Sequence, residues 1–188
     1  MLEGIITSKT KVNILIKLFL NPGNRAYLRE LATEFGVSTN SVRTELNNLT
    51  NNDILISEKD GRNIFYRANV THPLFPELSS MVRKITGIDE LARSVIERLG
   101  NLEAVYITGD YARGVDSGII DVIFLGNINR VQMDDIINKT ENYIKRKIRP
   151  MVLTAGEFID LDKRGSLGMK LKLWELGLED DSAEEGIT

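Results

Sequence analysis

The sequence predicts an α+β protein in two parts, and three observations lead to this expectation. Apolar residues recur at helical spacing from residue 10 to residue 51. A strand–turn–strand pattern follows, and beyond it short strand-like runs alternate with helical patterns, as in a small α/β domain with a mixed sheet. With 188 residues, 42% of them hydrophobic, the chain is long enough to bury a core in both parts.

The first two helices are predicted from apolar spacing and from the residues that end them. Apolar side chains recur at helical spacing over residues 10–20, and Asn21-Pro22-Gly23 ends this helix because proline cannot continue it. A second helix is expected over Leu28–Phe35, whose apolar residues share one face. Gly36 supplies the turn that follows.

A third helix is predicted over Thr39–Asn51, with Ser38 as its N-cap. Val42, Leu46 and Leu49 fall at i, i+4 and i+7, so we expect them to face the core. The opposite face carries side chains that can read base edges in a major groove, namely Asn40, Arg43, Thr44 and Asn47. The alternative is that this face is merely solvated, although a solvated helix face usually carries Glu and Lys.

A hairpin with a basic tip is predicted after the third helix. Strand-like residues 54–58 and 64–69 are joined through Lys59-Asp60-Gly61-Arg62, and Asp-Gly predicts a tight turn with positive φ at both of its residues. Helix, helix, turn, helix and hairpin is the order of a winged helix. At this tip, we expect Lys59, Arg62 and Asn63 to contact a nucleic-acid partner.

The second part is predicted to start with two helices, over residues 76–87 and 88–99, after a proline-containing connector. Strands are expected at residues 103–108, 121–125, 151–154 and 169–173, and a helix at residues 131–147. We therefore divide the chain into a winged-helix domain, a helical connector, an α/β domain and an acidic tail, at residues 1–75, 76–100, 101–178 and 179–188.

Composition excludes several kinds of site. The chain has no cysteine and a single histidine, His72, which excludes a disulfide framework, a cysteine nucleophile and a histidine-rich zinc site. Any metal would sit on carboxylates, which favours magnesium-like ions. No apolar run reaches the roughly 18–20 residues that cross a bilayer, and the start lacks a signal-peptide core. We therefore expect a cytoplasmic protein with no membrane partner.

The charge is divided unevenly between the two parts. The net charge is −3, but residues 1–87 carry 11 Lys and Arg against 8 Asp and Glu, a balance of +3. Residues 88–188 carry 13 against 19, a balance of −6. The first part is therefore the candidate for phosphate contact.

Residues 9–69 resemble the ArsR/MarR-like winged-helix regulators. The resemblance is carried by Tyr27-Leu28-Arg29-Glu30-Leu31-Ala32, Gly36-Val37-Ser38, Ser41-Val42-Arg43 and Leu46-Asn47-Asn48-Leu49. It implies that the third helix enters the major groove of double-stranded DNA, that the hairpin wing contacts the flanking backbone or minor groove, and that a homodimer reads two half-sites. The cysteine ligands of metal-sensing members are absent. A winged helix that serves only as a protein-interaction module is the alternative.

Residues 102–150 resemble the DNA-polymerase-beta-type nucleotidyltransferases. Gly109-Asp110-Tyr111-Ala112-Arg113-Gly114 followed by Asp121-Val122-Ile123-Phe124 is similar to their Gly-Ser-x-Ala-x-Gly and Asp-x-Asp pattern. In active members the loop cradles a triphosphate and both aspartates share magnesium ions. Here Asp110 stands at the serine position, where it would repel phosphate by about 3 kcal/mol per unit charge at about 5 Å. Ile123 stands at the second aspartate position and cannot bind metal.

We therefore expect a DNA-binding transcriptional regulator whose second domain is a non-catalytic platform for a small-molecule effector or for another protein. Its nucleotide-like loop consists of Gly109, Asp110, Arg113 and Gly114; alternatively, the two glycines only shape a turn around Tyr111 and Arg113. The competing hypothesis is a magnesium-dependent nucleotidyltransferase that transfers a nucleotide from a nucleoside triphosphate to a small molecule or protein. It requires Asp121 as the catalytic residue and, as metal ligands, Asp121 and Asp116.

Overall fold

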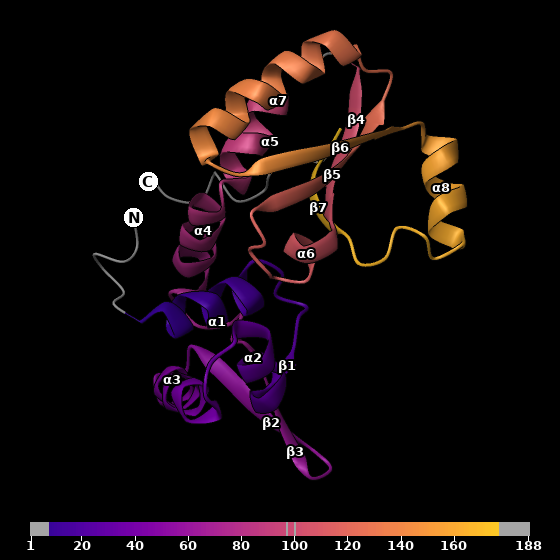
Figure 1. The fold of residues 1–188 in the computed structure, drawn as a ribbon. Coiled ribbons are helices and arrows are strands. Elements are labelled where there is room, and N and C mark those ends of the chain that lie inside the picture. The colour runs from indigo at the N-terminus through magenta and orange to yellow at the C-terminus, as the bar shows by residue number, and fades with distance from the viewer. Residues whose placement is uncertain (1–7, 97, 100, 177–188) are drawn as a thin grey trace, which may run out of the picture.

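The computed structural model describes residues 8–96, 98–99 and 101–176. Within these residues the chain forms eight helices and seven strands, arranged in a three-stranded antiparallel sheet and a four-stranded mixed sheet (Figure 1). The predicted α+β class is confirmed. The predicted acidic tail at residues 179–188 lies outside the described residues.

The first part is a winged helix with the predicted element order. Its sheet has the order β1-β3-β2, and every neighbouring pair is antiparallel. The Ser38 side chain caps the third helix by accepting the backbone N–H of Ser41. The elements are α1 (Lys9–Phe19), β1 (Ala26–Tyr27), α2 (Leu28–Phe35), α3 (Thr39–Asn51), β2 (Leu55–Asp60) and β3 (Asn63–Ala68).

The turn of the β2–β3 hairpin differs from the predicted Asp-Gly turn. Asp60 pairs with Asn63, so the two loop residues are Gly61 and Arg62. Gly61 has a φ of 60°, whereas Asp60 and Arg62 are not among the described residues with positive φ. The prediction of positive φ at both Asp60 and Gly61 is therefore wrong. Glycine at the first of two loop positions is the pattern of a type II′ turn.

The second part continues with two helices and a mixed sheet of order β6-β5-β4-β7. Strands β5 and β6 are parallel, and β4 is antiparallel to both β5 and β7. The elements are α4 (Phe75–Thr86), α5 (Ile88–Ile96), β4 (Leu102–Thr108), α6 (Gly109–Ala112), β5 (Ile119–Gly126), α7 (Arg130–Ile144), β6 (Lys147–Leu153), α8 (Ala155–Lys163) and β7 (Leu171–Glu175).

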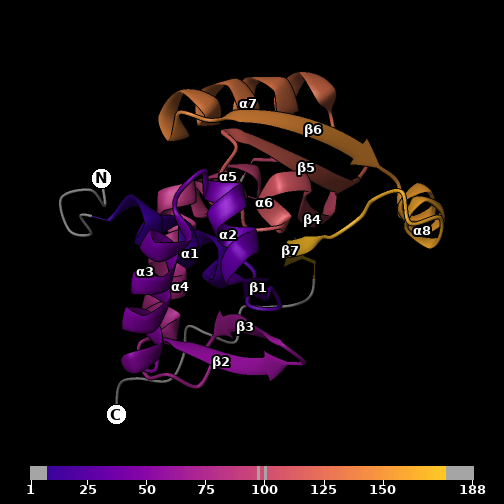
Figure 2. The same ribbon diagram turned by 60° about the horizontal axis from the view of Figure 1, so that its bottom comes forward.

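The two faces of the mixed sheet are covered differently. Inward residues of β5, Ile120, Val122 and Phe124, belong to the main core together with residues of α5 and α7. On the opposite face Ile123 and Leu125 pack in a smaller cluster with residues of α8. Figure 2 shows α7 over β5 and β6, and α8 at the far end of the sheet.

Several elements in the second part differ from prediction. Helix α7 ends at Ile144, and Lys145 has a left-handed φ of 58°. Strand β6 then begins at Lys147, which pairs with Ile119 of β5 and donates its backbone N–H to the Gly118 carbonyl oxygen at 2.9 Å. The Glu141 carboxylate accepts the next backbone N–H, that of Ile148, at 2.8 Å. Helix α8 is not predicted, and β7 begins and ends two residues later than expected.

The two parts share one hydrophobic core. Helix α4 lies against α1, where the rings of Phe19 and Phe75 are 5.6 Å apart, and Ser79 donates to the Phe19 carbonyl oxygen at 3.3 Å. Buried residues of α1, α3, α5, α7 and the mixed sheet form a single cluster. The domain boundaries after residues 75, 100 and 178 stay predictions. No helix in the described part of the chain has the length and apolarity that crossing a membrane requires.

Candidate nucleic-acid interface and nucleotide-like loop

The outer face of α3 is exposed, as the sequence predicts. Val42, Leu46 and Leu49 are buried on the inner face and fix the rotation of the helix about its axis. Figure 1 shows α3 and the β2–β3 hairpin at the end of the molecule opposite α7. The structure therefore brings together on one exposed face all four predicted residues, Asn40, Arg43, Thr44 and Asn47.

Three of these four side chains keep their polar groups available. Within the described residues, the side chains of Asn40, Arg43 and Asn47 make no hydrogen bond or ion pair. The Thr44 hydroxyl instead donates to the Asn40 carbonyl oxygen within the helix at 3.0 Å. Thr44 can therefore meet a base through its methyl group or as an acceptor, but its donor is already used.

The single acidic residue of α3 is turned away from this face. Glu45 pairs with Lys11 of α1 at 3.3 Å, and only 16% of its side chain is exposed. Close to this pair, the hydroxyls of Thr10 and Ser41 lie 3.2 Å apart and further join α1 to α3. The exposed face of α3 therefore carries no carboxylate that would repel phosphate. The sequence pattern did not identify this pairing because it depends on how α1 crosses α3.

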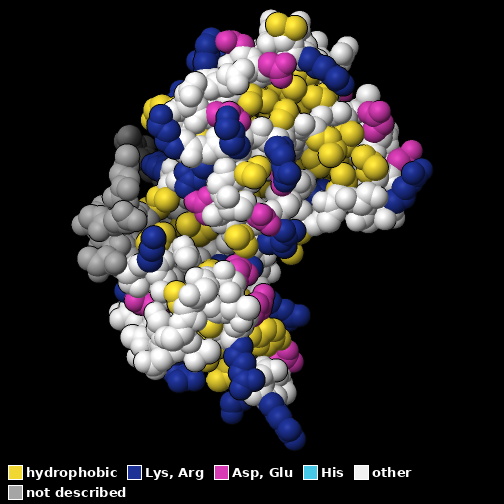
Figure 3. Space-filling model, in the orientation of Figure 1, with side chains coloured by type: hydrophobic (Ala, Val, Ile, Leu, Met, Phe, Trp, Pro, Cys, Tyr) yellow, Lys and Arg dark blue, Asp and Glu magenta, His cyan; other side chains and the backbone are white. Residues whose placement is uncertain are grey.

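The predicted wing residues lie exposed at the hairpin tip: Lys59, Arg62 and Asn63. Figure 3 shows Lys and Arg side chains projecting from the lower end of the molecule, where Figure 1 places the hairpin. Sequence reasoning missed two further exposed cations, Arg25 and Arg29, on either side of β1. Arg29 lines a shallow depression together with Thr39, so it lies beside the start of α3.

The nucleotide-like loop is packed against the winged helix. It forms the one-turn helix α6 between β4 and β5, and Tyr111 and Ala112 are fully buried. A Cβ atom added at Gly114 would lie 2.6 Å from the Cα atom of Lys17 in α1. Asn21, after α1, donates to the Ala112 carbonyl oxygen at 3.1 Å. Gly114 therefore permits the backbones of the loop and α1 to touch.

Asp121 is held by an arginine. The parallel register of β5 and β6 places Asp121 opposite Arg149. The Arg149 Nε and Nη2 atoms donate to the two carboxylate oxygens at 2.6 and 2.8 Å, and this bidentate bond raises the pKa of Arg149. Gly109 lies so close to Asp121 that a Cβ atom at this glycine would collide with the carboxylate.

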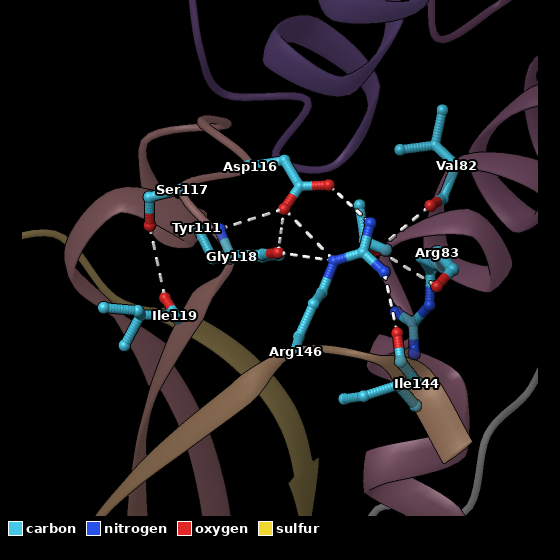
Figure 4. Close-up of polar contacts among 10 residues, drawn as sticks. Val82, Arg83, Tyr111, Asp116, Ser117, Gly118, Ile119, Ile144 and Arg146 are labelled. Carbon is cyan, nitrogen blue, oxygen red and sulfur yellow. Dashed lines mark hydrogen bonds and ion pairs between the residues drawn. The ribbon is translucent and has the colours of Figure 1, made fainter. Parts of the chain in front are cut away.

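Asp116 belongs to a different network, which closes the loop against the end of α7 (Figure 4). Arg146 donates to Asp116 through Nη2 at 2.5 Å and to the Ile144 carbonyl oxygen at 3.1 Å, and the Tyr111 hydroxyl also donates to Asp116. Burial alone would raise the pKa of Asp116, but the hydrogen bonds from Arg146 and Tyr111 outweigh it and lower that pKa. Burial, together with Asp116, raises the pKa of Tyr111.

These residues do not fit a magnesium site. Asp110 pairs with Arg113, so each of the three carboxylates Asp110, Asp116 and Asp121 has its own arginine. Ile123 is buried beneath α8. Among the described residues no group of three acidic or histidine side chains could hold a metal ion. Neither converging carboxylates nor an apolar environment surrounds Asp121, whose two carboxylate oxygens accept hydrogen bonds from Arg149.

Comparisons with known proteins give only distant similarities. No protein-family model matches the sequence, and no curated protein matches it. Reduced HlyU from Vibrio cholerae N16961 is 18% identical with a TM-score of 0.36, over 46% of this chain and 83% of that chain. A nucleotidyltransferase-like protein from Sulfolobus solfataricus is 25% identical with a TM-score of 0.36, over 53% of this chain and 86% of that chain. The adhesin competence repressor AdcR from Streptococcus pyogenes is 19% identical with a TM-score of 0.35, over 51% of this chain and 72% of that chain.

Replacing Gly114 with alanine is expected to lower the free energy of unfolding by about 2–5 kcal/mol, because both the left-handed backbone and the contact with Lys17 oppose a Cβ atom. Gly118→Ala is the matched control, since Gly118 also has positive φ but has open space around it. This control is expected to lose only about 1–2 kcal/mol. Chemical denaturation measures both values, and equal losses would contradict the close contact between the loop and α1.

Proposed function

We propose that this chain is a sequence-specific DNA-binding transcriptional regulator that inserts α3 into the major groove. The observation that carries this proposal is the exposed row of Asn40, Arg43 and Asn47, whose side chains are not engaged within the described residues, on a helix with a buried inner face. Arginine suits a bidentate contact with guanine, and asparagine one with adenine. A face of amide and guanidinium groups suits base edges better than the apolar centre of a protein interface.

The wing adds a contact that does not depend on base sequence. Lys59 and Arg62 project from the hairpin tip, where they can neutralise phosphates that flank the groove occupied by α3. We further propose that the chain acts as a homodimer, because two recognition helices reading two half-sites supply more specificity than one.

The second domain is proposed to be a non-catalytic platform for an effector or another protein. The pairing of each loop carboxylate with an arginine supports this proposal, since magnesium would have to displace Arg149 to reach Asp121. The loop also has a physical connection to the DNA-binding part. Gly114 touches the backbone of Lys17, and the buried Lys17 side chain pairs with Glu34 of α2 at 2.8 Å. A ligand that moved the loop would therefore act on the helix that packs against α3.

Replacing Arg43 with alanine is expected to weaken binding to a duplex selected from genomic fragments by about 1–3 kcal/mol, which is roughly 5- to 150-fold in Kd. Arg130→Ala is the matched control, because Arg130 is also exposed but lies at the start of α7, at the opposite end of the molecule. The control is expected to bind as the unmodified chain does. Titration of labelled duplex measures both, and equal affinity of Arg43→Ala, Asn40→Ala and the unmodified chain would exclude base reading by α3.

Calorimetric titration with each of the four ribonucleoside triphosphates and magnesium is expected to give no binding heat. The reason is that Asp121 already accepts two hydrogen bonds from Arg149 and that Ile123 provides no second ligand. Magnesium-dependent triphosphate binding that Asp121→Asn abolishes would instead support the nucleotidyltransferase hypothesis.

A further inference from the structure

The tip of the wing extends beyond the part of the sheet that supports it. Strand β1 pairs with β3 only at Ala26 with Tyr66 and at Tyr27 with Phe65. The β2–β3 ladder continues past this support to the pair of Asp60 and Asn63. The residues that carry the basic tip therefore form a two-stranded ribbon, and such a ribbon is only marginally ordered by itself.

Tyr27 connects this ribbon to the helix-turn-helix. It is the last residue of β1 and the N-cap of α2, where its backbone N–H donates to the Glu30 carboxylate at 3.2 Å. Its ring lies edge-on to that of Phe65, with centroids 6.3 Å apart. Its hydroxyl reaches farther out along the ribbon and donates to Asp60 Oδ2 at 2.5 Å, a bond that raises the pKa of Tyr27.

The other contacts of the hairpin do not make this connection. The ion pair of Arg67 with Glu58 joins β3 to β2 and so lies within the ribbon. The Arg25 guanidinium lies 5.2 Å above the Phe65 ring, at the level of the β1 support rather than at the tip. In the described part of the chain, the bond from Tyr27 to Asp60 is the only side-chain hydrogen bond between residues 59–64 and the rest of the winged helix.

We propose that Tyr27 is a positioning residue for DNA binding, whose hydroxyl fixes the wing tip relative to α2 and α3. This inference rests on the proposed DNA binding. Asp60 directly precedes the turn that carries Arg62, so holding its carboxylate also holds the basic residue in place. With the tip fixed beforehand, α3 and the wing contact the duplex together without a further loss of conformational entropy on binding. The bond also restrains the carboxylate of Asp60, which would otherwise move freely beside the phosphates.

The test replaces Tyr27 with phenylalanine in the full chain and measures affinity for the selected duplex. Phenylalanine keeps the ring and removes only the hydroxyl, so we expect affinity to fall about 3- to 10-fold while the chain still unfolds cooperatively, with a midpoint lowered only by the loss of one exposed hydrogen bond. Tyr66→Phe is the matched control, because Tyr66 lies in the same sheet and its hydroxyl makes no hydrogen bond within the described residues. This control is expected to bind as the unmodified chain does.

A double-mutant cycle separates positioning of the wing from a general structural role. If Tyr27 acts through the wing, Tyr27→Phe has little further effect in a chain that carries both Lys59→Ala and Arg62→Ala, but lowers affinity by the same roughly 3- to 10-fold in an Arg43→Ala chain. The positioning role would be overturned if Tyr27→Phe lowered affinity equally in both chains. It would also be overturned if Tyr27→Phe alone left affinity unchanged while Arg43→Ala still lowered it. Either result would leave the proposed function intact. An unmodified chain that selects no duplex would overturn both.

Discussion

The contact between the backbones of Gly114 and Lys17 is the constraint on which the arrangement of the molecule depends. It places the loop of the mixed-sheet domain directly on α1, and Asn21 adds a hydrogen bond beside it. On its other side α1 holds α2 through Lys17 and Glu34, and α3 through Lys11 and Glu45. Helix α1 therefore lies between the loop and α3, and the continuous core follows from this position.

The same constraint gives the glycines of the nucleotide-like loop a role in packing. Gly109 accommodates the carboxylate of Asp121 and Gly114 accommodates α1, so both glycines serve the internal packing of this chain. Asp116 and Asp121, the metal ligands that the nucleotidyltransferase hypothesis requires, pair with Arg146 and Arg149, and those ion pairs join the loop to the end of α7 and to the neighbouring strand. This supports the alternative, open from the sequence, that the glycines shape a turn.

Local sequence patterns predicted the features that depend on a single helix. They failed for features that depend on contacts between residues far apart in the sequence. The spacing of Val42, Leu46 and Leu49 was sufficient to place the exposed face of α3. The pairing of Asp121 with Arg149 needed the register of two strands, and the start of β6 needed its pairing with Ile119 of β5. Helix α8 was missed because none of its residues is buried, although Thr154 and Glu157 form a capping box that the sequence displays.

Base reading by α3 from within the major groove is tested most directly by methylation interference. On a selected duplex, methylation of guanine N7 within the half-site is expected to block binding, because that atom lies in the major groove. In an Arg43→Ala chain the interference at one guanine should disappear while the others remain. An interference pattern confined to the minor groove, or one identical in both chains, would contradict the account.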